Sequence, residues 1–185
     1  YDEDLIIDLR LNMLDQYVDK FIICEAKFSH SGRKKGLNFD ISKFLKFKDK
    51  IEYVIIDNEP EGLIYENDTK KKESHLNWRL NSVKRIAFQR NKLFDAVNEI
   101  ANENDYIMYS DNDEIPNLDL FDSENNKSKI TIFEQDLFYY KFNLLCDRIK
   151  WYGTRIIKKK DLINFEWLRQ IKPKKYPFYR IDTFL

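Results

Sequence analysis

Residues 76–116, LNWRLNSVKRIAFQRNKLFDAVNEIANENDYIMYSDNDEIP, carry the strongest structural pattern in this chain. Apolar side chains recur there at spacings of three, four and seven, which predicts one amphipathic helix over 76–101. The stripe consists of Leu76, Leu80, Val83, Ala87, Phe94, Val97 and Ala101. Residues 105–111 then read as an apolar strand, and Pro116 prevents it from continuing as a central strand. A long helix that leads into a strand is typical of α/β folds.

Shorter patterns on both sides support the same fold class. Apolar runs predict strands at 21–26, 51–57, 130–133, 138–143 and 151–157, and helices at 41–47 and 165–169. Near the start, residues 5–18 read as a helix with a stripe of Leu5, Leu9, Met13 and Tyr17. Alternating strands and helices predict an α/β fold with a mostly parallel central sheet, mixed toward its end. A chain of 185 residues is most simply one domain over 1–185.

Composition excludes several classes of protein. Lys plus Arg and Asp plus Glu both number 32, so the basic excess of a nucleic-acid binder is missing. There is no apolar run of about 18 residues, so we expect no membrane span. The first ten residues carry acidic side chains where a signal peptide carries basic ones. Cys24 and Cys146 are each isolated in apolar segments, so we expect both to be reduced thiols in the core. We therefore expect a cytoplasmic protein, and the missing initiator Met leads us to expect an incomplete amino terminus.

Asp111 ends the predicted strand at 105–111, and Asp113 and Glu114 come directly after it. In open α/β sheets, ligands bind at the carboxyl ends of strands. Three carboxylates within four residues repel one another unless a cation or solvent intervenes. Hard oxygen ligands suit Mg²⁺ or Mn²⁺, so we expect Asp111 and Asp113 to bind a divalent metal together with substrate phosphates. The alternative is an acidic turn without a ligand, since Asp and Asn are common turn residues.

Two further side chains stand out against apolar surroundings. Arg90 fills the seven-residue gap in the helix stripe, where a buried arginine needs a partner or a ligand. Glu25 ends the apolar run at 21–26, and an acid there is costly unless it faces a loop or a ligand. Because both Glu25 and Asp111 follow strands, we expect them to line one crevice. The alternative for Glu25 is a strand-end residue in solvent.

Short segments over most of the chain resemble the motifs of one known family. They are VDKFIICEA at 18–26, FQRN at 88–91, SDNDEIP at 110–116, and shorter matches at 3–5, 10–12, 31–32, 140–143 and 151–154. Together they resemble glycosyltransferase family 17, which includes the enzyme that adds the bisecting N-acetylglucosamine to N-glycans. The match of 110–116 to the family's DxDEIP motif is the most specific. The family's Gly-Trp-His motif is missing, so we expect either a truncated chain or a short divergent member.

The resemblance implies a fold and a set of roles. The fold would be a single GT-A-like nucleotide-diphosphosugar transferase domain. Asp111 and Asp113 would hold Mn²⁺ or Mg²⁺ against the donor diphosphate. Glu25, Arg90, Asn91 and Asp111 would lie near the donor. Glu114 is a candidate catalytic base by its position only.

Three functions remain open at this point. The first is a metal-dependent glycosyltransferase that moves a sugar, N-acetylglucosamine by resemblance, from a UDP-sugar to a glycan hydroxyl, with inversion if the family's outcome carries over. The second is a metal-dependent phosphatase or nucleotidyltransferase that uses the same carboxylates. The third is a carbohydrate- or protein-binding module without catalysis, with Trp78, Trp151 and Trp167 as platforms, although core packing is the commoner role of such residues.

Overall fold

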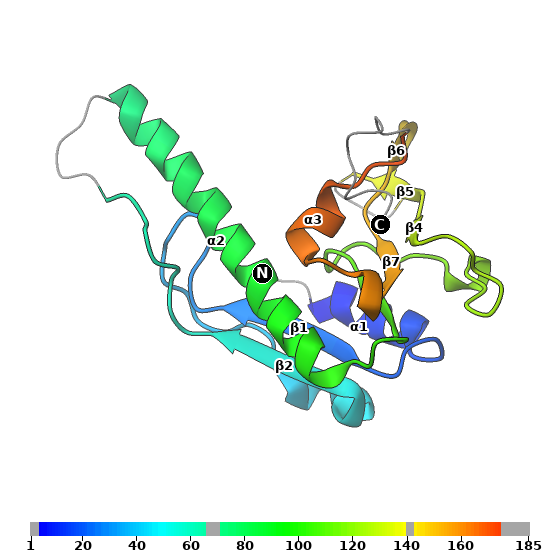
Figure 1. Cartoon of the computed structure of the whole chain (residues 1–185). Helices are drawn as coiled ribbons and strands as arrows, with labels where there is room; N and C mark the ends of the chain where they lie inside the picture. The colour runs from blue at the N-terminus through cyan, green and yellow to red at the C-terminus, as the bar shows by residue number, and fades with distance from the viewer. Residues whose placement is uncertain (1–3, 66–70, 140–142, 175–185) are drawn as a thin grey trace. The chain divides into compact units, whose positions relative to one another are not determined.

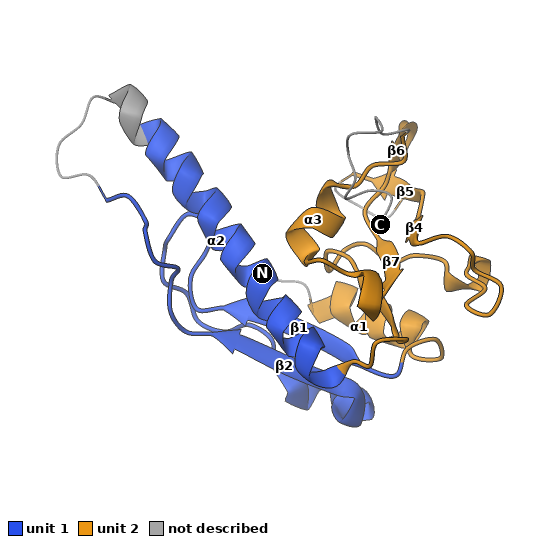
Figure 2. Ribbon diagram, viewed as in Figure 1, with its two compact units in different colours: residues 1–2, 19–100 blue, residues 3–18, 101–185 orange. Residues whose placement is uncertain are grey.

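The computed structural model describes residues 4–65, 71–139 and 143–174. Over this part of the chain the fold is mixed α/β, as expected. It divides into two compact units, which Figure 2 shows in different colours. As far as they are described, the first unit is formed by residues 19–100 and the second by residues 4–18 and 101–174. A single catalytic domain over 1–185 stays a prediction.

The first unit is built on a parallel pair of strands, β1 (Phe21–Ala26) and β2 (Ile51–Ile56). Parallel strands need a crossover connection, and here it contains the 3₁₀ segment η1 (Ile41–Lys50). The helix α2 (Lys71–Ile100) follows β2 and packs against both strands (Figure 1). The strands and the helix predicted for this region are therefore confirmed.

Aromatic side chains supply much of the core of the first unit. Phe39 stacks on Phe44 with ring centroids 5.5 Å apart, and Phe21 meets Phe47 edge to face at 6.4 Å. Each fully buried side chain of this size contributes roughly 1.5–3 kcal/mol through removal of apolar surface from water. The core thus holds the connection between β1 and β2 tightly to the strands.

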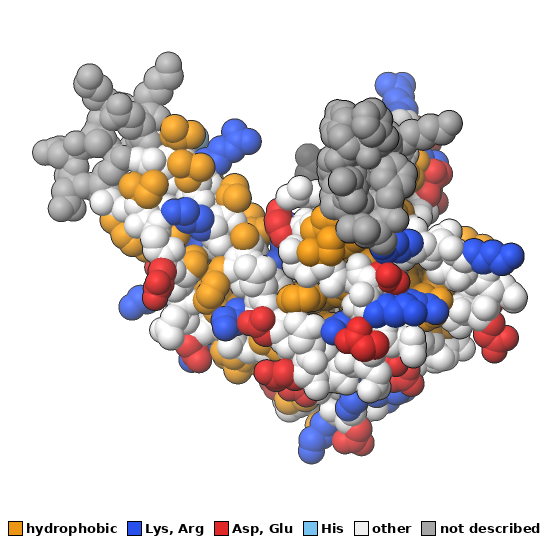
Figure 3. Space-filling view, viewed as in Figure 1, with side chains coloured by type: hydrophobic (Ala, Val, Ile, Leu, Met, Phe, Trp, Pro, Cys, Tyr) orange, Lys and Arg blue, Asp and Glu red, His pale blue; other side chains and the backbone are white. Residues whose placement is uncertain are grey.

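The buried face of α2 differs from the predicted stripe. Val97 is buried as expected, but Leu76, Leu80 and Val83 are 58%, 43% and 55% exposed, and Figure 3 shows apolar side chains on this part of the surface. Polar residues take the buried positions instead: Asn81 is 6% exposed and Arg85 3%. The reason is that two loops of the first unit pack on this half of the helix and bond to those polar groups.

The second unit contains a three-stranded antiparallel sheet and a separate antiparallel hairpin. The sheet order is β3-β7-β4, and the hairpin pairs β5 with β6. The elements are α1 (Asp4–Leu14), β3 (Tyr106–Tyr109), η2 (Leu118–Leu120), β4 (Ile130–Ile132), β5 (Gln135–Phe138), β6 (Leu145–Trp151), β7 (Arg155–Lys158), η3 (Lys159–Asp161) and α3 (Phe165–Gln170). Tyr109 at the end of β3 stacks on Phe165 of α3, with ring centroids 4.7 Å apart.

Sheet direction is where the sequence-based expectation is wrong. Only β1 and β2 run parallel, and all other strand pairs of the described residues are antiparallel, so no mostly parallel central sheet is seen there. The strand predicted at 151–157 is in fact two strands separated by residues 152–154. A short connection accounts for one of these pairs, because β5 and β6 are separated by only six residues and strands joined so closely pair antiparallel. The β3–β7 and β4–β7 pairs join segments far apart in the sequence, so local patterns could not predict their direction. Part of the strand predicted at 138–143 lies outside the described residues.

The helix α1 is confirmed, but its predicted apolar stripe is wrong. Leu5, Leu9, Met13 and Tyr17 are 71%, 41%, 50% and 39% exposed. The buried residues are Ile7, Leu11 and Leu14, whose spacing of four and three also places them on one face. The segment is apolar on two sides, so periodicity alone could not decide which side is buried. No helix of the described residues has the length and apolarity required to cross a membrane.

Candidate functional site

The loop 110–116 leaves β3 and presents the three carboxylates on which the metal prediction rests. Asp111 and Asp113 are exposed, whereas Glu114 is buried at 4% exposure. Pro116 is fully buried and anchors the far end of the loop. The three acids therefore occupy two different environments, although they are neighbours in the sequence.

Arg10 of α1 holds the backbone of this loop. Its guanidinium donates to the carbonyl oxygens of Asp111, at 3.3 Å, and Glu114. It also donates to the hydroxyl of Ser110. Burial lowers the pKa of Arg10 to about 10, against the opposite effect of the nearby carboxylates of Glu114, Asp113 and Asp111. The group therefore stays charged at neutral pH and provides a permanent cation under the loop.

The carboxylate of Glu114 is the internal acceptor of the site. Its Oε1 accepts from Trp151 Nε1 at 2.7 Å and from Arg169 at 3.0 Å. Its Oε2 accepts from the backbone N–H of Asp111 at 3.0 Å. The backbone of Gly153 lies so close that an added Cβ would come within 2.1 Å of the carboxylate. Glu114 is therefore surrounded by hydrogen-bond donors. Because a side chain at position 153 would collide with its carboxylate, only glycine fits there.

Asp111 makes the second ion pair of Arg169. The guanidinium donates to Asp111 Oδ2 at 2.7 Å, and the side chain of Asp111 remains 49% exposed. Arg169, which lies on α3, also donates to the carbonyl oxygen of Gly153 at 2.7 Å. One arginine thus joins the loop 110–116, the segment before β7 and α3.

A third arginine completes the charge balance of this site. Arg155 is fully buried, and its guanidinium donates to the carbonyl oxygens of Ile171, at 2.9 and 3.2 Å, and Gly153. Burial, and then the charge of Arg169, lower its pKa. Arg10, Arg155 and Arg169 thus offset the three carboxylates of the loop, whose charges would otherwise repel one another.

The carboxylates fit the donor chemistry of a divalent cation. Within the described ranges, no group of three or more His, Cys, Asp and Glu side chains is placed to hold a metal by itself. Mg²⁺ in nucleotide sites, however, is usually bound by one or two carboxylates together with substrate phosphates. Asp111 and Asp113 are exposed carboxylate residues and match that partial donor set.

Glu25 lies in the first unit, where it closes the loop that follows β1. Its carboxylate accepts from the backbone N–H groups of Asn38 and Phe39 at 3.0 Å, and from the hydroxyl of Tyr53 at 2.9 Å. Lys35 donates to it as well. Burial alone would raise the pKa of Glu25, but these hydrogen bonds outweigh it and lower the pKa. The structure therefore places Glu25 within a network that orders the loop 27–39.

On α2, the buried arginine is not the predicted one. Arg90 is half-buried and Asn91 exposed. Arg85, in contrast, is 3% exposed and forms an ion pair with Glu59 at 2.5 Å. Its guanidinium also lies against Gly32, whose φ of +86° favours glycine.

The predicted residues are thus divided between the two units. Asp111, Asp113 and Glu114 lie together in the second unit, and Glu25, Arg90 and Asn91 lie in the first. A shared crevice for Glu25 and Asp111 stays a prediction. Sequence reasoning gave no role in the site to Arg10, Arg85, Arg155 and Arg169, and it named Trp151 only as a possible platform for a ligand. The scarcity of arginine, nine residues beside 23 lysines, was one signal that could have singled out the four arginines.

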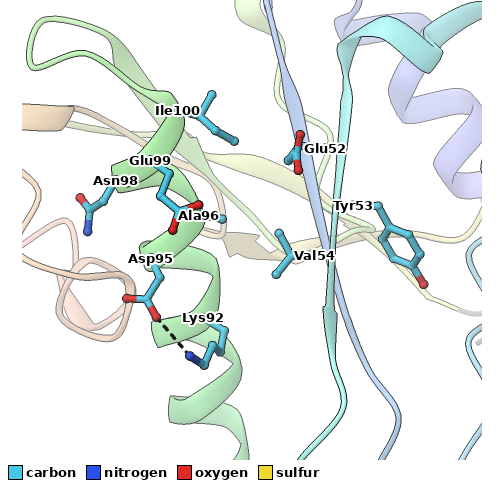
Figure 4. Close-up of a pocket in the computed structure, with 9 residues that line it drawn as sticks. All are labelled: Glu52, Tyr53, Val54, Lys92, Asp95, Ala96, Asn98, Glu99 and Ile100. Carbon is cyan, nitrogen blue, oxygen red and sulfur yellow. Dashed lines mark hydrogen bonds and ion pairs between the residues drawn. The ribbon is translucent and has the colours of Figure 1, made fainter.

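A separate groove of about 720 Å³ lies between β2 and the carboxyl-terminal half of α2 (Figure 4). Glu52 and Val54 of β2 and Lys92 and Asp95 of α2 are among its lining residues, and Lys92 forms an ion pair with Asp95 at 3.5 Å. None of the predicted site residues lines it. The groove is therefore distinct from the loop 110–116.

The chain matches one known protein family over most of its length. The family model described as Glycosyltransferase family 17 matches residues 2–172. The chain belongs to glycosyltransferase family 17. It is a glycosyltransferase, which requires a sugar donor and a glycan acceptor, and this decides against the phosphatase and binding-module alternatives. Comparisons with curated proteins and with solved structures found no significant match.

Proposed function

We propose that this family 17 enzyme transfers a sugar, N-acetylglucosamine by family resemblance, from a UDP-sugar to a glycan hydroxyl with the help of Mn²⁺ or Mg²⁺. The observation that carries the proposal is the pair of exposed carboxylates of Asp111 and Asp113. They lie on a loop whose backbone is fixed by hydrogen bonds to the side chains of Arg10 and Glu114. A loop ordered in this way keeps two like charges close together before any ligand arrives. Such preorganisation is what a metal–diphosphate site requires.

In the proposed site, Asp111 and Asp113 hold the cation. The bound ion would offset the charge that develops on the leaving diphosphate. Arg169 lies beside Asp111 and adds a fixed positive charge on the same side of the loop. In a direct displacement, the acceptor oxygen forms a bond to the anomeric carbon while the bond between that carbon and the diphosphate oxygen breaks. The electron pair leaves with the diphosphate, and the hydroxyl proton passes to a base.

Glu114 is better suited to positioning than to taking that proton. A general base must come within hydrogen-bond reach of the acceptor hydroxyl. Glu114 is 4% exposed and is already bonded to Trp151, Arg169 and the backbone of the loop. We therefore assign it the role of orienting Asp111. The GT-A-like arrangement is likewise a proposal, supported by the parallel β1–β2 pair and by the strand β3 that leads into the carboxylates.

The experiment that tests the proposal is calorimetric titration of UDP with and without Mn²⁺. Asp113→Asn should remove the Mn²⁺-dependent part of UDP binding while the thermal midpoint of the unliganded protein stays unchanged, because the side chain is exposed. Asp147→Asn, at an exposed position on β6, is the matched control and should bind UDP as the parent does. Unchanged Mn²⁺-dependent binding by the Asp113 variant would place the metal site elsewhere.

A further inference from the structure

Trp151 combines two properties that rarely occur together. Its side chain is 41% exposed at the end of β6, although large aromatic residues usually bury most of their surface. At the same time its indole nitrogen is tied to a buried carboxylate, Oε1 of Glu114, at 2.7 Å. The indole is therefore held in one orientation while a large part of it faces solvent.

A comparison with Trp78 shows that exposure alone does not produce this arrangement. Trp78 on α2 is 51% exposed, and the contact seen for its ring is an edge-on one with the exposed His75, 5.9 Å away. Trp151 is instead bonded to Glu114, and Arg169 lies 5.9 Å from its ring centroid. An aromatic surface that is ordered in advance loses little side-chain entropy when a ligand packs on it.

The position of Trp151 connects it to the proposed metal loop. Glu114 accepts from Trp151 on one carboxylate oxygen and from the backbone N–H of Asp111 on the other. The indole N–H of Trp151 and the backbone N–H of Asp111 are therefore linked through a single carboxylate, that of Glu114. Arg169 makes a second link between the ring and Asp111, since its guanidinium lies 5.9 Å from the ring centroid and donates to Asp111 Oδ2 at 2.7 Å.

We propose that the exposed ring of Trp151 is the platform on which a pyranose ring of a substrate stacks. The inference rests on the proposed function for its link to the diphosphate, and on the established enzyme class for its ligand. The C–H groups on one face of a pyranose carry partial positive charge and complement the negative face of an indole. The exposed side chain of Asn112, between the two carboxylates, offers a hydrogen-bond partner for a sugar hydroxyl.

Fluorine NMR of protein labelled with 5-fluorotryptophan tests the platform directly. The chain has three tryptophans, so three signals are expected, and Phe substitutions at Trp78, Trp151 and Trp167 assign them. The probes are UDP and UDP-N-acetylglucosamine, each with Mn²⁺, and the free disaccharides lactose, maltose, mannobiose and N,N′-diacetylchitobiose. The Trp78 signal is the internal control and should not move.

The arms of this titration separate the two sources of the pyranose. A shift of the Trp151 signal with UDP-N-acetylglucosamine beyond that with UDP identifies the donor sugar. A shift with a disaccharide alone identifies the acceptor. A Trp151 signal that does not move with any saccharide, or that moves equally with UDP, overturns the proposal. If UDP with Mn²⁺ neither binds nor changes the thermal midpoint, the proposed function fails, and the disaccharide arm still decides the platform.

Affinities of variants then separate stacking from a purely structural role. Trp151→Ala should weaken binding of the identified saccharide about tenfold, the effect of losing an aromatic contact of about 1.4 kcal/mol, with UDP affinity unchanged. Trp151→Phe keeps a ring and should stay within about threefold of the parent. Trp78→Ala is the matched control. An equal loss of UDP and saccharide affinity in Trp151→Ala would show that Trp151 acts only by orienting Glu114, which overturns the proposal.

Discussion

At the scale of single residues, Glu114 and Glu25 have the same structural role in the two units. Each is a buried acid that accepts hydrogen bonds from several surrounding donors, and each orders a loop that follows a strand. Buried charges are tolerated only where such partners are complete. Removing either carboxylate therefore leaves several donors without an acceptor.

For Glu114 we predict a large loss of stability. Glu114→Ala should lower the free energy of unfolding by about 3–5 kcal/mol, because the buried side of an ion pair with Arg169 is removed and Trp151 loses its acceptor. Urea denaturation followed by circular dichroism measures it. Glu134→Ala, an exposed glutamate near Lys150, should cost about 0–1 kcal/mol. Equal losses in the two variants would mean that Glu114 does not support the loop.

For Glu25 we predict a dependence on pH. Because its pKa is lower in the folded protein than in the unfolded chain, its ionised form stabilises the fold above the unfolded pKa. That contribution is fully present at neutral pH and is lost as the pH falls below about 4 and through the folded pKa. Glu25→Gln should therefore be less stable than the parent at pH 7, with a gap that narrows on acidification. Glu61→Gln, at an exposed position, should show no such trend.

At the scale of elements, two of the arginines on α2, Arg85 and Arg90, have different expected roles although they are only five residues apart. Arg85 fastens the loops around His30 and Glu59 to the helix, whereas Arg90 is the half-buried residue predicted to serve the donor. A long helix can therefore combine a structural and a functional segment on neighbouring turns. Substitution by Met, which keeps length and apolarity, separates the two roles.

We expect Arg85→Met and Arg90→Met to behave differently. Arg85→Met should destabilise the protein by about 1–3 kcal/mol, because Glu59 and the carbonyl of His30 lose a buried donor. Arg90→Met should keep the parent's thermal midpoint and lose affinity for UDP with Mn²⁺. Differential scanning fluorimetry and titration of UDP measure the two effects. An Arg90 variant that binds UDP normally but is less stable would indicate a structural role instead.

At the scale of the whole molecule, the chain order and the compact units do not coincide. The helix α1 belongs to the second unit, and the rest of that unit begins only at residue 101. Ile7, Leu11 and Leu14 bury the inner face of α1, and Arg10 on the same helix bonds to the loop 110–116. The second unit therefore needs both of its separate segments, α1 and the part of the chain that begins at residue 101.

Hydrogen exchange with a core substitution in α1 tests this organisation. Leu11 is 1% exposed, so Leu11→Ala should cost about 2–5 kcal/mol and raise exchange in β3, β7 and α3, with β1 and β2 much less affected. Leu5→Ala is the control on the same helix, since Leu5 is 71% exposed, and should leave exchange unchanged. Faster exchange confined to β1 and β2 would contradict the assignment of α1 to the second unit.

Most elements and the family could be predicted from the amino-acid sequence. Strong local patterns predicted β1, β2 and β3 within two residues of their observed bounds, because runs of apolar residues are local properties of the chain. Helical periodicity predicted α2 from residue 76, five residues after its observed start. The acidic loop after β3 was also recognisable, since its residues are consecutive. The family match over residues 2–172 agrees with that recognition.

Three features became clear from the folded structure alone: which faces are buried, how the strands pair and which residues surround the acidic loop. Arg10, Trp151 and Arg169 come from α1, β6 and α3, far apart in the sequence, and no spacing rule connects them. The buried side of α1 and the burial of Arg85 depend on which groups pack against the helices. Periodicity records that a face is apolar, but burial of a polar side chain depends on partners that folding brings from elsewhere in the chain.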